Sequence, residues 1–371
     1  RLLLRLPGLV WLGLRNLPTG RARRHLGWLR QVQEDGEAAE TLYSEACAIM
    51  EAGFGSESPN TAVCLGDWAK VLAGLNRLEQ ARDKLETSLA IRNQAFPAGH
   101  PETANAHTDL GYLFWRMGDF EAAGEQYQEA FRIREALFGE NHLITLESIL
   151  NLVLVQERTG NRNRAEQLSM ERLHRTRQHH GEDLSAVSRA LYSHSTLLVR
   201  LGKTNEAIAG HRELVAMMPI DRGDTRRAAG MRYALVSLLV QPKHAEEVLA
   251  RIGEIEAVLS SRPELTYPPP AGVRFYQARA LMMLDRHEEA LPLLEEAIQL
   301  QIAASGEDHY RVGDMTWLLG LCLWKTADLQ AGQPTLSRAI EIMDRVQGEN
   351  GRDHLLYRSI LQAAEGRAEQ A

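Results

Sequence analysis

A segment that recurs every 42 residues constrains the fold of this chain more than any other feature. The sequences AIMEAGFGSESPNTA, AIRNQAFPAGHPETA and RIREALFGENHLITL begin at residues 48, 90 and 132. Other positions follow the same register, and one column holds five alanines: Ala39, Ala81, Ala123, Ala165 and Ala207. A repeat of this length predicts a stack of similar units that pack on their neighbours, and not a set of separate compact domains.

Each repeat predicts two helices joined by a tight turn. In the third repeat, apolar residues with helical spacing occur on both sides of Gly118, which lets the chain leave one helix and turn back. The second helix is expected to end at FGENH, and Thr145 is predicted to cap the helix that follows. The two expected apolar faces are Ala104, His107, Leu110, Gly111 and Phe114, then Phe120, Ala123, Tyr127, Ala130 and Ile133.

Small residues are predicted to mark the point where the two helices of a unit cross. Gly27, Ala69 and Gly111 share one column of the repeat. We expect the alanine column of the second helix to face it, because a larger side chain there would push the helices apart.

The repeat becomes less regular after Pro219, which ends the fifth unit early. The next helix pair is predicted to break at Gln241 and Pro242, and a proline-rich connector follows at residues 261–272. The 42-residue register then resumes. A last helix from about Asp353 to Glu365 is expected to cap the stack.

Composition indicates a folded chain without an obvious catalytic site. Of 371 residues, 44% are hydrophobic and 25% are charged. The three cysteines, with no CxxC spacing, predict neither a disulfide framework nor a thiolate metal site, and favour a reducing, cytoplasmic location. Phosphate-binding loops, nucleophile elbows and HExxH motifs do not occur in the sequence, so we expect no enzyme activity, no metal and no cofactor.

Charge is distributed unevenly along the chain. Residues 1–30 contain seven arginines and no acidic residue, whereas the whole chain carries a net charge of −7. The acidic repeat region disfavours nucleic acid as a partner. The basic segment can contact an anionic membrane, but pairing of its arginines with acidic residues elsewhere is the preferred interpretation. Its apolar run, residues 6–14, is too short to span a bilayer.

The repeat resembles the tetratricopeptide repeat, a helix-turn-helix unit. The third repeat carries that pattern, and its 42-residue length with IREALFGENHLIT resembles the long repeats of kinesin light chains and their bacterial relatives. The residues that match the pattern are Leu110, Gly111, Phe114, Ala123, Tyr127 and Ala130.

This resemblance implies an all-α fold, a right-handed α-solenoid of about eight helical hairpins with a C-terminal capping helix. It also implies a bacterial source. The expected segments are a basic apolar segment (1–19), regular repeats (20–221), a degenerate helix pair (222–266), further repeats (267–350), and a capping helix with a tail (351–371).

In this family the first helix of each unit lines a concave groove that suits an extended peptide or a helix. Carried over by repeat position, the groove residues of blocks three to five predict a peptide-binding surface. The predicted binding residues are Asn105, Asp109, Tyr112, Trp115, Arg116, Asn151, Arg158, Tyr192 and Arg200, with Thr108, Glu147 and Arg189 at equivalent positions.

Arg116, Arg158 and Arg200 form one column of that surface, 42 residues apart. Their guanidinium groups can hold carboxylates or backbone carbonyls of a bound chain. An equally supported alternative is a structural role, because an arginine near a helix C-terminus also satisfies the last free carbonyls.

Three functions remain compatible with these features. The preferred one is a non-catalytic scaffold that binds a protein or peptide, as the adaptor or sensor part of a larger protein or complex. The others are a receptor whose signal peptide controls an upstream effector domain, and an accessory subunit that holds a substrate for an enzyme. Because the chain begins at Arg1 and not at methionine, we expect it to be a piece of a longer protein.

Overall fold

The computed structural model describes residues 20–33, 35–97, 99–219, 225–262, 264–326 and 329–347. The predicted segments 1–19 and 351–371, including the expected capping helix, lie outside these residues. Within them the chain is all-α, as predicted: helices follow one another in pairs and no strand occurs.

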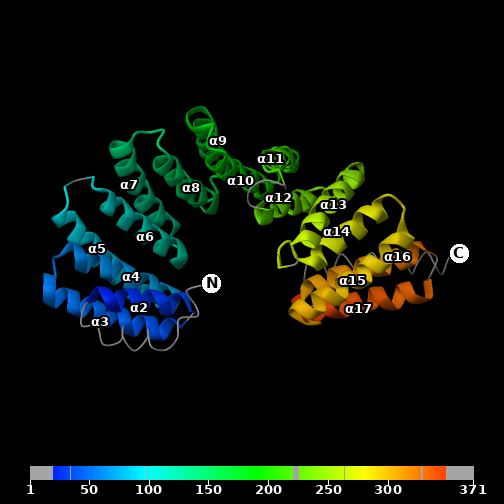
Figure 1. The fold of residues 1–371 in the computed structure, drawn as a ribbon, viewed down its shortest axis with the longest axis horizontal. Coiled ribbons are helices and arrows are strands. Elements are labelled where there is room, and N and C mark those ends of the chain that lie inside the picture. Colours follow the sequence, from blue (N-terminus) through cyan, green and yellow to red (C-terminus); the bar gives the residue numbers. More distant parts are fainter. Residues whose placement is uncertain are drawn as a thin grey trace. The chain divides into compact units, whose positions relative to one another are not determined.

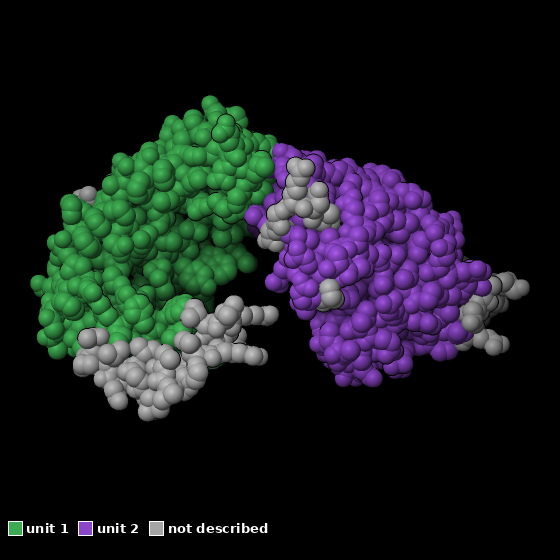
Figure 2. Space-filling view, in the orientation of Figure 1, with its two compact units in different colours: residues 1–197 green, residues 198–371 purple. Residues whose placement is uncertain are grey.

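The helices divide between two compact units, residues 1–197 and 198–371, each described by itself (Figure 2). Helix α10 (Leu184–Arg200) contains the boundary. The other helices of unit 1 are α2 (Gly20–Val32), α3 (Gly36–Phe54), α4 (Pro59–Gly74), α5 (Leu78–Ala95), α6 (Pro101–Met117), α7 (Phe120–Phe138), α8 (Leu143–Arg158) and α9 (Arg162–His180). Unit 2 contains α11 (Thr204–Met217), α12 (Thr225–Leu238), η2 (Pro242–His244), α13 (Ala245–Ser261), α14 (Pro270–Met283), α15 (His287–Ser305), α16 (Tyr310–Lys325) and α17 (Leu329–Gln347).

Unit 1 is a stack of helical hairpins. Helices α2 and α3, α4 and α5, α6 and α7, and α8 and α9 pack as pairs, and α3 also packs on α4, α5 on α6 and α7 on α8. The first helices α4, α6 and α8 lie along one side of the stack, and the second helices α5, α7 and α9 lie along the other (Figure 1). We call the surface formed by α2, α4, α6 and α8 the first-helix face.

The turns inside the second, third and fourth hairpins of unit 1 have the expected left-handed residue. Gly118 has φ 85° and is the C-cap residue of α6, as the sequence predicts. In the second repeat Asn76 takes the same place with φ 61°, and asparagine is one of the few other residues that tolerate this conformation.

The small-residue column meets the second helix at the alanine column and at a tyrosine four residues later. In the second repeat Ala69 and Ala81 belong to one buried cluster, as predicted. A Cβ added at Gly111 would lie 2.8 Å from the ring of Tyr127, and one added at Gly27 would lie 2.9 Å from the ring of Tyr43. The glycines are therefore needed because a tyrosine ring packs closely against the first helix. In the second repeat, Ala69 is combined with the smaller Leu85 in one apolar cluster.

Thr145 does not cap α8. The N-cap residue is His142, whose Nδ1 accepts a hydrogen bond from Ile144 N over 3.2 Å, and His100 caps α6 in the same way. Thr145 is buried and donates from Oγ1 to the carbonyl oxygen of Arg134. This residue therefore joins two consecutive helices, which is the role expected of a repeat junction.

The cysteine prediction also requires correction. Cys47 of α3 and Cys64 of α4 form a disulfide, and Cys322 is a buried free cysteine. The disulfide connects the second helix of one repeat to the first helix of the next. An odd cysteine count does not exclude such a pair, because one cysteine can stay free.

Unit 2 continues the hairpin pattern around its own core. Buried residues of α11, α12, α13 and α14, among them Ile208, Leu235, Ile252 and Val273, form one apolar cluster. The predicted break at Gln241 and Pro242 is confirmed, since α12 ends at Leu238 and a short 3-10 turn precedes α13. None of the described helices is both long enough and apolar enough to cross a membrane.

Candidate functional site

A pocket of about 450 Å³ lies on the first-helix face of unit 1, between α4 and α6. Four of the nine predicted binding residues line it: Asp109, Tyr112, Arg116 and Asn151. The remaining lining residues are Ala69, Lys70, Ala73, Gly74, Leu85, Thr108, Leu113 and Tyr127. Residues from three successive first helices therefore meet at one site.

Helical spacing explains why these side chains meet. Asp109, Tyr112 and Arg116 are three and four residues apart on α6, so they occupy one side of that helix. Small residues of α4, Ala69, Ala73 and Gly74, leave the space into which this side faces.

Two polar contacts connect α6 to α4 at the pocket. Lys70 Nζ lies 2.9 Å from Asp109 Oδ2, and the Lys70 side chain remains 51% exposed. Arg116 donates from Nη1 to the carbonyl oxygen of Ala73 over 2.6 Å. A lysine ammonium carries three donors, so Lys70 keeps hydrogen-bonding capacity beyond its contact with Asp109.

The base of the pocket is apolar and neutral. Leu85 and Tyr127, both buried, reach it from the second helices α5 and α7. Burial raises the pKa of Tyr127 to about 12, and neighbouring Tyr112 and Asp109 act in the same direction. The Tyr127 phenol therefore stays protonated at neutral pH. By contrast, Tyr112 is 54% exposed and presents its ring at the surface.

Trp115 and Arg158 are brought together outside the pocket. The Arg158 guanidinium lies 5.6 Å from the centre of the Trp115 ring, a cation–π contact. The Trp115 ring also stacks on Tyr112 and contacts the edge of Phe120, with centroids 6.4 Å apart in both cases. Trp115 supports the pocket from the side and does not line it.

Asn105 is engaged by the second helix of its own repeat. Arg134 donates from Nη2 to Asn105 Oδ1 over 3.0 Å and from Nη1 to Ser148 Oγ over 2.9 Å. Asn105 does not line the pocket.

Tyr192 and Arg200 lie on α10, and neither lines the pocket. Tyr192 is 41% exposed. Arg200 belongs to unit 2, whereas Arg116 and Arg158 belong to unit 1.

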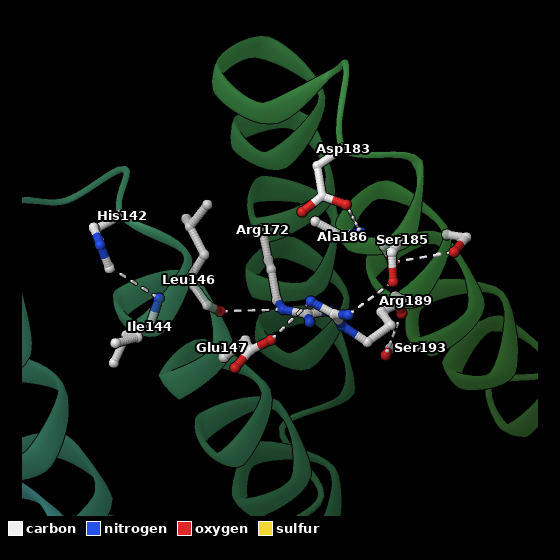
Figure 3. A network of polar contacts seen from close by, with 11 residues as sticks. His142, Ile144, Leu146, Glu147, Arg172, Asp183, Ser185, Ala186, Arg189 and Ser193 are labelled. Atoms are coloured by element: carbon white, nitrogen blue, oxygen red, sulfur yellow. Dashed lines mark hydrogen bonds and ion pairs between the residues drawn. The ribbon is translucent and has the colours of Figure 1, made fainter.

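The edge of the first-helix face is held together by a polar network at the start of α8 and α10 (Figure 3). Arg189 Nη2 lies 3.3 Å from Glu147 Oε1, 42 residues earlier, and Arg189 Nη1 donates to Ser185 Oγ. Beside them, buried Arg172 donates from Nε to the carbonyl oxygen of Leu146. Glu147 and Arg189, both at groove positions of the repeat, therefore connect neighbouring helices.

A second pocket of about 450 Å³ lies between α2 and α4, and the sequence prediction missed it. Its lining residues are Arg24, His25, Trp28, Gln31, Tyr43, Asp67 and Lys70. Lys70 thus belongs to both pockets. The 42-residue register could have found this site, because Trp28 and Lys70 occupy the column of Tyr112, and Asp67 that of Asp109.

The second pocket contains a partly buried ion pair. Arg24 Nη1 lies 3.5 Å from Asp67 Oδ2. Burial raises the pKa of Asp67, and the positive charges of Arg24 and Lys70 oppose that rise. Basic and acidic side chains therefore alternate along α2, α4 and α6 and offset one another.

Comparison with known proteins supports a repeat architecture. The family described as tetratricopeptide repeat matches residues 18–94, 102–178 and 274–345. A clustered mitochondria protein homolog from Ajellomyces capsulatus is 30% identical over 90 residues, which are 24% of this chain and 7% of that protein. The chain therefore spans a small fraction of the length of this curated relative.

Two solved structures with TM-scores above 0.5 share the fold at low identity. The STAND protein with a tetratricopeptide repeat sensor from Pyrococcus horikoshii has a TM-score of 0.60 at 14% identity, over 86% of this chain and 47% of that one. The apo quorum sensor NprR from B. thuringiensis has a TM-score of 0.55 at 11% identity, over 87% of both chains. Kinesin light chain TPR-like repeats from Podosopora anserina are 17% identical with a TM-score of 0.49, over 53% of this chain and 93% of that one.

Proposed function

Because the chain belongs to the tetratricopeptide repeat family, we propose that it is a non-catalytic scaffold that binds an extended peptide on the first-helix face of unit 1. The pocket between α4 and α6 is the observation that carries this proposal. It combines an exposed aromatic ring, an apolar base and charged groups from neighbouring repeats. Such a mixture orients a peptide through a few polar contacts while burying its apolar side chains.

The sensor form of this role is supported by two relatives in fold. The Pyrococcus horikoshii protein has a tetratricopeptide repeat sensor, and the B. thuringiensis protein is a quorum sensor. By analogy we propose that this chain reports a bound peptide to a larger protein or complex. The substrate-holding accessory subunit remains the alternative. A cytoplasmic location, the 42-residue subfamily and a bacterial source remain predictions.

The test begins with peptides selected against the full chain from a random display library. Their dissociation constants are then measured for the wild type, Tyr112→Ala and Asp109→Asn. We expect Tyr112→Ala to raise the dissociation constant at least tenfold, because an exposed aromatic ring at a pocket supplies a large share of the binding energy.

Met170→Ala is the matched control. Met170 is 55% exposed on the second helix α9, against 54% for Tyr112, and it lies outside both pockets. Selected peptides whose affinity falls equally with Met170→Ala and Tyr112→Ala, or with neither, would contradict the proposed site.

A further inference from the structure

We propose that the bound segment is a proline-containing peptide in the polyproline II conformation, whose residues i, i+3 and i+6 face Trp28, Lys70 and Tyr112. This inference rests on the proposed function and deepens it, since it specifies the conformation and register of the ligand. It extends the site across both pockets of the first-helix face.

The three facing residues form one column of the repeat. Trp28, Lys70 and Tyr112 are 42 residues apart and lie on α2, α4 and α6. Trp28 is 52% exposed and Tyr112 is 54% exposed, so both rings offer a face at the surface. Lys70 lies between them and lines both pockets. A ligand that crosses the helices therefore meets an aromatic ring, an ammonium group and a second aromatic ring in that order.

The spacing of the helices sets the register of the ligand. The pairs Arg24–Asp67 and Lys70–Asp109 show that α2, α4 and α6 are neighbours within side-chain reach. Ion pairs between facing side chains place the axes of successive first helices on the order of 10 Å apart, close to the spacing of packed helices. One turn of a polyproline II helix contains three residues and rises about 9 Å. One side chain per turn can therefore face each successive first helix.

Other ligand conformations fit the column less well. In an extended strand, residues i and i+6 point to the same side but i+3 points to the opposite side, away from Lys70. An α-helix returns to the same side after seven residues, about 10.5 Å, but its carbonyl groups are bonded internally. A polyproline II segment has no internal hydrogen bonds, so its carbonyl oxygens are available to Lys70.

The chemistry of the surface agrees with this register. Proline rings pack on aromatic side chains, and the preformed conformation loses little entropy on binding. Lys70 is flanked by the carboxylates of Asp67 and Asp109. Because Arg24 and Lys70 offset these two acids, the surface does not require a charged ligand. A neutral backbone carbonyl can accept a hydrogen bond from the ammonium group of Lys70, which has three donors.

The test uses synthetic peptides of equal composition with the full chain. One peptide carries prolines at positions i and i+6, and the other carries them at i and i+5, with a fixed dye for fluorescence anisotropy. We expect the i+6 peptide to bind at least fivefold more tightly. Trp28→Ala and Tyr112→Ala should each remove the preference, whereas Trp28→Phe and Met170→Ala should retain it, with circular dichroism confirming that each variant folds.

Two results would overturn the inference. One is equal affinity for the two spacings. The other is a tighter-binding proline-free peptide of helical sequence that also depends on Trp28. If selected peptides still depend on Tyr112 in either case, the proposed function stands and only the register is wrong. If no peptide depends on Tyr112, both proposals fail.

Discussion

Arg116 of α6 donates from Nη1 to the carbonyl oxygen of Ala73, 43 residues earlier, at the C-terminal end of α4. Arg158 also contacts a residue 43 positions earlier, because its guanidinium group lies over the ring of Trp115. In both cases the arginine reaches back to the preceding first helix. Arg116 therefore has the structural role, because it satisfies a carbonyl at the end of a helix in the preceding repeat. The same residue also lines the pocket.

Replacing Arg116 should reduce stability as well as binding. Arg116→Met keeps the aliphatic stem but removes a charged donor to the end of α4, so we expect the free energy of unfolding to fall by about 1–2 kcal/mol. Urea denaturation measures this change. Arg132→Met is the control, because Arg132 is exposed and pairs with Glu129 within its own helix, so its replacement should leave the free energy of unfolding nearly unchanged. Equal stability of the two variants would show that Arg116 does not join repeats.

The glycine at position 111 should be replaceable only together with its tyrosine partner. Gly111→Ala places a methyl group 2.8 Å from the Tyr127 ring, so we expect a loss of about 1–3 kcal/mol in thermal or urea unfolding. Gly53→Ala, where a Cβ meets nothing within 4 Å, should be neutral or slightly stabilising.

The second repeat suggests a rescue for this change. It combines Ala69 with Leu85, so the double variant Gly111→Ala/Tyr127→Leu should recover part of the loss. A single variant as stable as the wild type would show that the tyrosine ring does not require glycine.

The disulfide should be detectable by counting thiols. Without reductant, the denatured chain should expose one free thiol, that of Cys322, and the native chain should react slowly because burial raises the pKa of Cys322 to about 11. The disulfide closes a loop with a sequence separation of 17 residues. Cys47→Ala or reduction should therefore lower the free energy of unfolding by about 3 kcal/mol. Three reactive thiols in the unreduced denatured chain would contradict the bridge.

His211 should contribute to acid sensitivity. Burial lowers its pKa in the folded state, and a hydrogen bond with the Ala207 carbonyl opposes this effect only in part. Below the unfolded pKa of about 6.5 the unfolded chain binds more protons, so the contribution of His211 is present above that pH and is lost as the pH falls through the folded pKa.

His211→Leu tests this sign, since leucine occupies the same repeat column at Leu85. Urea unfolding measures the free energy of unfolding at pH 7.5 and at pH 5.0. Between these two pH values the wild type should lose more stability than the variant. Parallel losses would assign the acid sensitivity to other groups.

The fold could be predicted from the sequence because the residues that determine it recur at the same positions of the 42-residue repeat. Turn residues such as Gly118, and the break at Pro242, depend on local backbone preferences that a single sequence displays. The helix cap at His142 was missed because histidine is an unusual N-cap residue, although its Nδ1 can accept the same hydrogen bond.

Parts of the site depended on contacts that repeat position alone does not reveal. The register placed Asp109 and Tyr112 in the pocket, but the base supplied by Tyr127 comes from the second helix. Asn105 accepts a hydrogen bond from Arg134 of the second helix. The disulfide between Cys47 and Cys64 depends on how two consecutive repeats pack. These features arise from packing between units, which periodicity locates only in part.

The most direct measurement of the central claim is site-specific photo-cross-linking on the full chain. Benzoylphenylalanine is introduced in place of Tyr112 or of Met170, and each protein is irradiated with a peptide selected against the wild type. We predict a cross-link from position 112 that excess unlabelled peptide abolishes, and none from position 170. A competed cross-link from position 170, with none from position 112, would contradict peptide binding on the first-helix face.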